Sequence, residues 1–239
     1  MTATSNAIYL VAVPFLRNGN LIALMPSLGV AMIIARLLRV VMALAIASGA
    51  QVHAQSDRLS QHGRSVVVVS SSAGDERFGL VDEAVSFWNM TFREIGVCYS
   101  LGPVTRLVQP VPEEALLSFR QLLDVSRGPH KIPPVLLDQS GDITIFLTDS
   151  EFVSFTAGIG QEKTVLGVRG LRFPPLTLPN VARNVITHLL GLALGLRHNS
   201  DPTTLMCGRP APCRPTLYRS IAPRVFPLTD AERRQLREG

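Results

Sequence analysis

The stretch THLLGLALGLRHNSDPTTLM, residues 187–206, constrains the fold of this chain more than any other stretch. It predicts a helix over Val181–Leu194 that Gly195 ends in the left-handed conformation. Such a glycine lets the chain turn sharply, and the turn brings His198 back toward the helix face that carries His188. The chain must therefore fold so that one helix and the loop after it converge on two histidines.

These histidines stand in a degenerate form of a metal-binding pattern. In H-E-x-x-H-x-x-G-x-x-H, two histidines one helical turn apart bind zinc, and the glutamate beside the first activates water. His188, Gly195 and His198 occupy the expected positions. Leu189, however, replaces the glutamate and Leu192 replaces the second histidine. The helix should survive both replacements, because leucine is a good helix former.

The residues after His198 extend the pattern, since HNSDP is followed by Leu205-Met206. The segment resembles the zinc-binding segment of the metzincin peptidases, and specifically of the matrixins. The resemblance implies that His188 and His198 are the first and third zinc ligands. It also implies that Met206 lies beneath the metal in a methionine turn and that Asp201 is a structural carboxylate near the chain start. A structural calcium ion is implied by the resemblance alone.

The two leucines predict a site with little or no endopeptidase activity. A catalytic zinc takes about three protein ligands plus water, and without a histidine at Leu192 only two known ligands remain. Without a glutamate at Leu189 no general base is left, and such a base contributes about 10²–10⁴ in rate. No other Asp or Glu lies between Arg183 and Arg197. We therefore expect a pseudoenzyme that binds zinc weakly or not at all and that can still hold a peptide or protein ligand.

Two alternatives remain open at this stage. A working zinc endopeptidase could use a carboxylate from elsewhere, such as Glu151 or Glu162, with Asp201 or Cys207 as the third ligand. The chain could also be a non-catalytic envelope or peptide-binding protein. No nucleotide-binding or serine-hydrolase motif is present.

The order of predicted elements over residues 64–239 also resembles the matrixin catalytic domain. The resemblance implies an α+β fold, with a twisted mixed β-sheet, a long packing helix, an active-site helix, a methionine turn and a C-terminal helix. The sequence itself predicts strands at 66–69, 97–99, 142–147 and 164–168, and helices at 72–95, 113–125, 181–194 and 228–237. Capping boxes are predicted in 72–75 and 228–232, a helix N-cap at 179–180, and a proline-rich turn region between 99 and 113. Trp88 is predicted to lie in the core.

The N-terminal part has the character of an export signal. Residues 1–55 contain no acidic residue, and Arg36 and Arg39 precede an apolar run at 40–47. We expect a signal peptide cleaved after Ala54, with Met32 as the more ordinary start, and a linker at 55–63. The protein is then secreted, either extracellular or periplasmic. The alternative is a membrane anchor formed by the uncleaved apolar segment.

Cysteines and charge add weaker expectations. Cys207 and Cys213 are close enough in sequence for a small disulfide loop, which leaves Cys98 unpaired. The 23 basic residues are scattered among 18 acidic ones, so no basic stripe indicates nucleic-acid binding. We expect a monomer.

Overall fold

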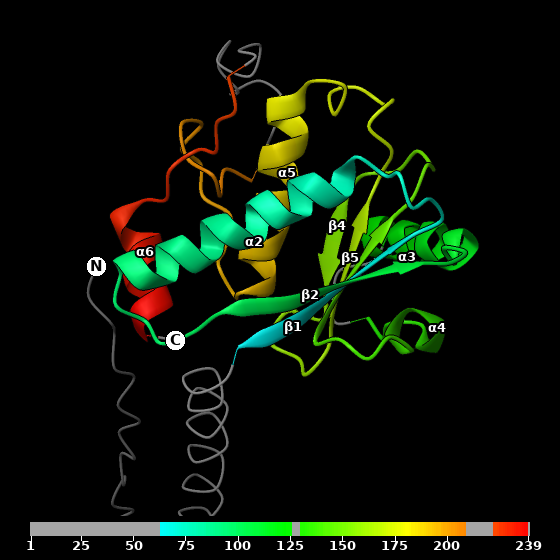
Figure 1. Cartoon of the computed structure of the whole chain (residues 1–239), viewed down its shortest axis with the longest axis horizontal. Coiled ribbons are helices and arrows are strands. Elements are labelled where there is room, and N and C mark those ends of the chain that lie inside the picture. The colour runs from blue at the N-terminus through cyan, green and yellow to red at the C-terminus, as the bar shows by residue number, and fades with distance from the viewer. Residues whose placement is uncertain (1–62, 126–129, 209–221, 239) are drawn as a thin grey trace, which may run out of the picture. The chain divides into compact units, whose positions relative to one another are not determined.

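A five-stranded β-sheet with the order β2-β1-β3-β5-β4 organises the domain (Figure 1). The computed structural model describes residues 63–125, 130–208 and 222–238, all within one compact unit, His53–Gly239. The strands are β1 (Arg64–Ser70), β2 (Leu101–Val108), β3 (Ile143–Leu147), β4 (Phe155–Ala157) and β5 (Thr164–Val168). Adjacent strands are parallel except β4, which pairs antiparallel with β5 and forms one edge. The predicted mixed sheet is confirmed.

The central strands are apolar because they are buried on both faces. In β1 the side chains of Val66 and Val68 pack into one core cluster, while Val67 and Val69 pack into the other. All five residues of β3 and of β5 are buried. A parallel strand covered by helices on both sides therefore reads as a continuous apolar run rather than an alternating one.

Helices cover both faces of this sheet. They are α2 (Arg77–Glu94), α3 (Glu113–Val125), α4 (Pro134–Leu137), α5 (Pro179–Ala193) and α6 (Asp230–Glu238). Helices α2 and α5 pack on the face that carries Val66, and α3 and α4 pack on the face that carries Val67 (Figure 1). The domain is thus an α+β fold of three layers, with α5, the motif helix, in an outer layer.

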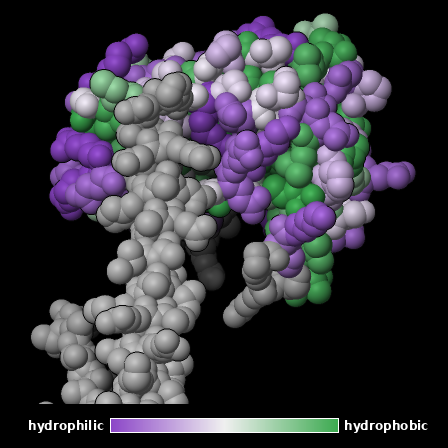
Figure 2. Space-filling view, turned by 90° about the horizontal axis from the view of Figure 1, so that it is seen from below, coloured by the Kyte–Doolittle hydropathy of each residue, from purple (hydrophilic) through white to green (hydrophobic). Residues whose placement is uncertain are grey.

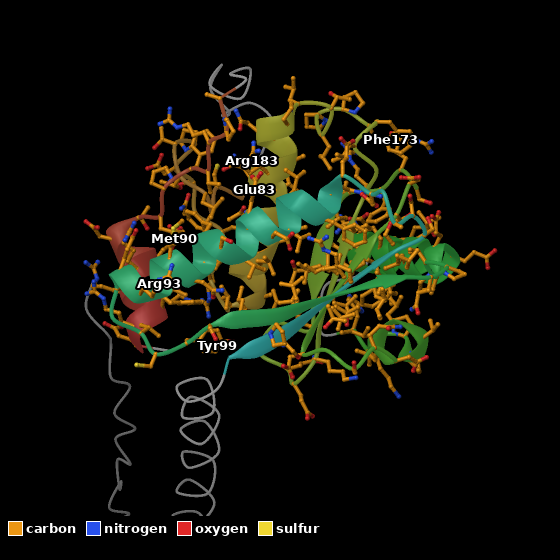
Figure 3. All side chains as sticks on the ribbon, in the orientation of Figure 1. Glu83, Met90, Arg93, Tyr99, Phe173 and Arg183 are labelled. Carbon is orange, nitrogen blue, oxygen red and sulfur yellow. The ribbon has the colours of Figure 1, made fainter. Side chains whose placement is uncertain are left out.

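Helices α2 and α5 are joined in the core and at the surface. The indole Nε1 of the fully buried Trp88 donates a hydrogen bond to the Thr187 carbonyl at 3.0 Å. Arg183 of α5 pairs with Glu83 of α2, and Figure 3 shows these two side chains together. The predicted core position of Trp88 is confirmed, and its indole also fixes the backbone of the motif helix.

The strand predicted at 97–99 is wrong. Residues 97–100 form no strand, and β2 lies instead in the segment that was predicted as a proline-rich turn region. An edge strand tolerates Pro103 because its outer side needs no backbone donors. Most of its residues are at least partly exposed, so the apolar signal of β2 is weak. Strand β4 and the short helix α4 were not predicted either.

Two predicted helix starts were also misplaced. The capping box at 72–75 does not form, because α2 begins at Arg77, whose backbone N–H donates to Asp75 Oδ1 at 3.0 Å. Helix α5 begins at Pro179, whose fixed φ suits the first helical position. Asn180 is therefore inside the first turn, and its side chain binds the backbone of Ala222 and Arg224 instead of capping the helix.

The C-terminal capping box is confirmed. The Thr229 N–H donates to Glu232 Oε2 at 2.8 Å, and the Glu232 N–H donates to Thr229 Oγ1 at 3.2 Å. Glu232 is buried, and its Oε1 accepts a hydrogen bond of 2.7 Å from Asn199 Nδ2. Helix α6 is therefore hydrogen-bonded, through Glu232, to Asn199 in the loop that follows the motif helix.

The predicted signal peptide, its cleavage site and the alternative anchor lie within residues 1–62, outside the described residues. Within the part of the chain that the structure describes, no helix has the length and apolar character needed to cross a membrane.

On the face seen in Figure 2, hydrophobic residues form separate patches among hydrophilic ones.

Close packing at Gly191 predicts an unusual response to alanine. A Cβ there would lie 2.7 Å from Met206 Sδ and 2.8 Å from Trp88 Cζ2. Alanine favours a helix by about 1 kcal/mol over glycine, but overpacking a core costs about 1–3 kcal/mol. Gly191→Ala should therefore lower the free energy of unfolding, measured by urea denaturation.

Gly79 of α2 provides the matched control, because a Cβ there meets nothing within 4 Å. Gly79→Ala should raise the free energy of unfolding. An equal gain from both substitutions would contradict the packing at Gly191.

Candidate functional site

The motif helix and the loop after it bring His188 and His198 together. Gly195 ends α5 with a φ of 88°, and the Leu196 N–H donates back to the Gly191 carbonyl at 3.0 Å. The chain then returns so that the Nε2 atoms of the two histidines lie 3.1 Å apart. Their rings are stacked, with centroids 5.0 Å apart and planes at 19°. The turn expected from the sequence is present.

His188 is oriented by the backbone of the loop. Its Nδ1 lies 2.9 Å from the Leu205 carbonyl oxygen, so Nδ1 carries the proton and donates. The His188 Nε2 lone pair then points at His198, whose Nε2 donates in the absence of an ion. Burial lowers the pKa of the His198 imidazole below its usual value. A backbone acceptor on the far nitrogen of His188 is the arrangement found behind metal-binding histidines.

Gly208 fixes the position of the His198 ring, and the sequence analysis missed this residue. The Gly208 N–H donates to the Asn199 carbonyl at 3.0 Å, and the Asn199 N–H donates to the Met206 carbonyl at 2.9 Å. A Cβ on Gly208 would lie 2.5 Å from His198 Cβ and 2.7 Å from its Cγ. The only sequence signal was a glycine two residues after Met206.

Met206 and Asp201 have different surroundings. Met206 is fully buried, with its sulfur against α5 at Gly191. Asp201 is exposed, and its Oδ1 accepts hydrogen bonds of 2.9 and 2.7 Å from the Thr203 N–H and hydroxyl. These bonds lower the pKa of the Asp201 carboxyl. Asp201 thus stabilises its own turn, and its predicted support of the chain start stays a prediction.

Cys207 is buried and lines the same cleft as the two histidines. Its predicted disulfide partner, Cys213, lies outside the described residues, so that pairing stays a prediction. Cys98 is exposed.

The two leucines line the cleft beside the histidines. Leu189 is only 4% exposed and belongs to the core, while Leu192 is partly exposed and packs against it. The Leu189 carbonyl accepts a hydrogen bond of 3.0 Å from Thr156 Oγ1, which connects α5 to β4. Both motif replacements therefore present hydrocarbon where the pattern requires a base and a ligand.

A zinc ion fits this site only in part. Two histidine nitrogens on a tetrahedral zinc stand about 3.3 Å apart, close to the 3.1 Å between the two Nε2 atoms. The part of the chain that is described contains no group of three His, Cys, Asp or Glu residues able to hold a metal. Glu151 and Glu162, proposed from the sequence as substitute bases, do not line the cleft. The residues present therefore suit a two-histidine contact but not a catalytic zinc, and nothing among the described residues supports the implied calcium ion.

The cleft has a volume of about 630 Å³ and lies between α3, β4, α5 and the loop after β5. Its lining is mainly apolar, with polar groups at few points. The apolar side chains include Leu123, Val153, Phe155, Leu176, Val181, Val185, Leu189 and Leu192. The cations are Arg120 and Arg169, and none of the described lining residues is Asp or Glu. The site is thus an apolar groove with basic groups and a histidine pair.

Comparison with known proteins gives a limited result. No protein-family model matches the chain, and no curated protein matches it. Among solved structures, archaemetzincin from Methanopyrus kandleri aligns with 74% of this chain and 93% of its own, at 17% identity and a TM-score of 0.42. A zinc-dependent peptidase from Methanocorpusculum labreanum (strain Z) aligns with 59% and 86%, at 13% identity and a TM-score of 0.29. At such TM-scores neither similarity assigns a family, ligand or activity to this chain.

Gly208→Ala should disturb the histidine pair. The added Cβ forces the His198 ring away from His188, and the overpacking lowers the free energy of unfolding by about 1–3 kcal/mol. Nitrogen-15 spectra of the imidazoles should change for both histidines. Gly74→Ala is the control, because the nearest atom to a Cβ there is 3.9 Å away. Unchanged imidazole spectra in Gly208→Ala would contradict the described placement of His198.

Proposed function

We propose that this chain is an exported, metzincin-like domain that binds an extended peptide in its cleft without hydrolysing it. The observation that carries the proposal is an apolar cleft that keeps two facing histidines, while leucines stand at the motif positions of the second histidine and the base. Weak zinc binding, a matrixin-type ancestry and secretion are parts of this proposal.

The absence of hydrolysis follows from the chemistry of the lining residues. Hydrolysis of a peptide bond at a metal centre needs an ion held firmly enough to lower the pKa of its bound water. It also needs a group that transfers protons, which contributes about 10²–10⁴ in rate. Leu189 and Leu192 supply neither, and no Asp or Glu lines the cleft among the described residues.

Peptide binding is supported by the position of β4. Within the described part of the chain this strand pairs with β5 alone, so its other side is an unpaired sheet edge there, and Ser154, Phe155 and Thr156 line the cleft. An extended peptide can add to such an edge through backbone hydrogen bonds, with alternate side chains in adjacent pockets. The apolar wall formed by α5 then receives the side chains that point into the groove.

Val153 offers a test of this binding mode. It is 62% exposed, lies just before β4 and lines the cleft. Val153→Asp should weaken binding of a fluorescent Val/Leu-rich peptide about tenfold, because a charge next to the apolar groove must be desolvated. Binding is measured by fluorescence anisotropy, and mass spectrometry should show the peptide intact after incubation.

Val135 supplies the matched control, since it is 46% exposed but does not line the cleft. Val135→Asp should leave peptide affinity unchanged. Peptide cleavage by the wild-type protein, or equal effects of both aspartates, would contradict the proposal.

A further inference from the structure

We propose that the cleft selects extended peptides with an internal acidic side chain, which the guanidinium of Arg120 binds; this inference rests on the proposed function. It adds a preferred ligand class to a groove otherwise described as apolar.

The charged groups that line the cleft are basic. Arg120 comes from α3 and Arg169 from the segment that follows β5. No described lining residue is a carboxylate that would neutralise them inside the groove. Low-dielectric walls of apolar side chains strengthen the field of such cations. The cleft is therefore electrostatically complementary to a ligand that combines apolar groups with a negative charge.

The two arginines differ in how far their hydrogen bonds are used. Arg169 Nη2 donates to the carbonyls of Phe173 and Pro174, which holds its own loop. Among the described residues Arg120 pairs with Asp124 alone, one helical turn further along, and the Asp124 side chain is 55% exposed. Arg120 Nε is buried and has no hydrogen-bond partner among the described residues. A ligand in the cleft cannot reach the buried Nε, but no described residue accepts a hydrogen bond from Arg120 Nη1, so the outer part of this guanidinium has bonding capacity left for a ligand.

The two buried arginines of the described domain, Arg77 and Arg183, contrast with the half-buried Arg120 because their donors are paired within the protein. Arg77 donates to Thr148 O at 2.6 Å and to Asp75 Oδ2 at 2.7 Å. Arg183 binds Glu83 and, at 2.8 Å, Asn180. Buried donors in proteins nearly always have acceptors. A ligand carboxylate matches the planar guanidinium better than a neutral amide does, because it accepts two charge-assisted hydrogen bonds.

The position of β4 favours an acidic side chain inside the peptide over one at its end. A strand that pairs with the free edge of β4 runs on in both directions along the groove. Its alternate side chains point to the same side, so one of them can reach Arg120 while its neighbours occupy the apolar wall. The ligand class is therefore an extended apolar peptide with an internal Asp or Glu.

The test uses two acetylated and amidated peptides of Val, Thr and Leu that differ only in a central Glu or Gln. Fluorescence anisotropy with the purified protein should give about tenfold tighter binding of the Glu peptide, the size expected for a charge-assisted hydrogen bond. Arg120→Gln should abolish this preference while leaving affinity for the Gln peptide unchanged. Arg120→Lys should retain part of the preference for the Glu peptide, because lysine keeps the positive charge but lacks the paired N–H donors of a planar guanidinium.

Arg106→Gln is the matched control, because Arg106 also pairs with one partly exposed carboxylate, Asp82, but does not line the cleft. It should keep the full preference for Glu. Equal binding of the Glu and Gln peptides, or equal effects of the Arg120 and Arg106 substitutions, would overturn the acid preference and leave the proposed function standing. Binding of neither peptide would overturn both. Preference for a free C-terminal carboxylate over the internal Glu would overturn the choice of an internal side chain.

Discussion

The contact between α5 and α2 is the constraint on which the rest of the site depends. Gly191 lets Trp88 and Met206 approach the motif helix more closely than a side chain at that position would allow. The Trp88 indole then binds the Thr187 carbonyl, one residue before His188. The first histidine is therefore positioned by core packing, by this buried hydrogen bond and by the hydrogen bond of its own Nδ1 to the Leu205 carbonyl.

The second histidine depends on a separate set of contacts that meet in the loop after α5. Gly195 reverses the chain, and Gly208 leaves room for the His198 ring. Between them, the Asn199 side chain binds Glu232, whose other oxygen caps helix α6. The C-terminal helix thus holds the loop that presents His198. The scaffold thus holds two histidines at chelating distance, although the described residues bring no third His, Cys, Asp or Glu ligand to them.

The sequence predicted these features to different extents, for physical reasons. Strong periodic patterns predicted α3 and the helix that carries His188, and apolar runs predicted β3 and β5. The capping box at residues 228–232 predicted α6. The local sequence signal of β2 is weak because β2 is a partly exposed edge strand with a proline. The signal of β4 is weak because the strand has only three residues. The roles of Gly191, Gly208 and Arg120 depend on contacts between segments far apart in the chain. Spacing along the sequence therefore could not identify these three residues. The spacing of His188, Gly195 and His198 is local, so it did predict that the two histidines meet.

The proposed function implies that the residues at positions 189 and 192 are what keeps this scaffold from acting as a metallopeptidase. The most direct test is Leu189→Glu combined with Leu192→His, because a four-residue step places 188 and 192 on one helix face. Zinc content by atomic absorption and chelator-sensitive cleavage of a denatured protein are measured against wild type, with Leu189→Gln/Leu192→Asn as the control and thermal melts to confirm folding. The double variant should hold about one zinc per chain and cleave, while the wild type and the control do neither. A folded double variant that neither retains zinc nor cleaves, or a wild type that already holds stoichiometric zinc, would contradict this account.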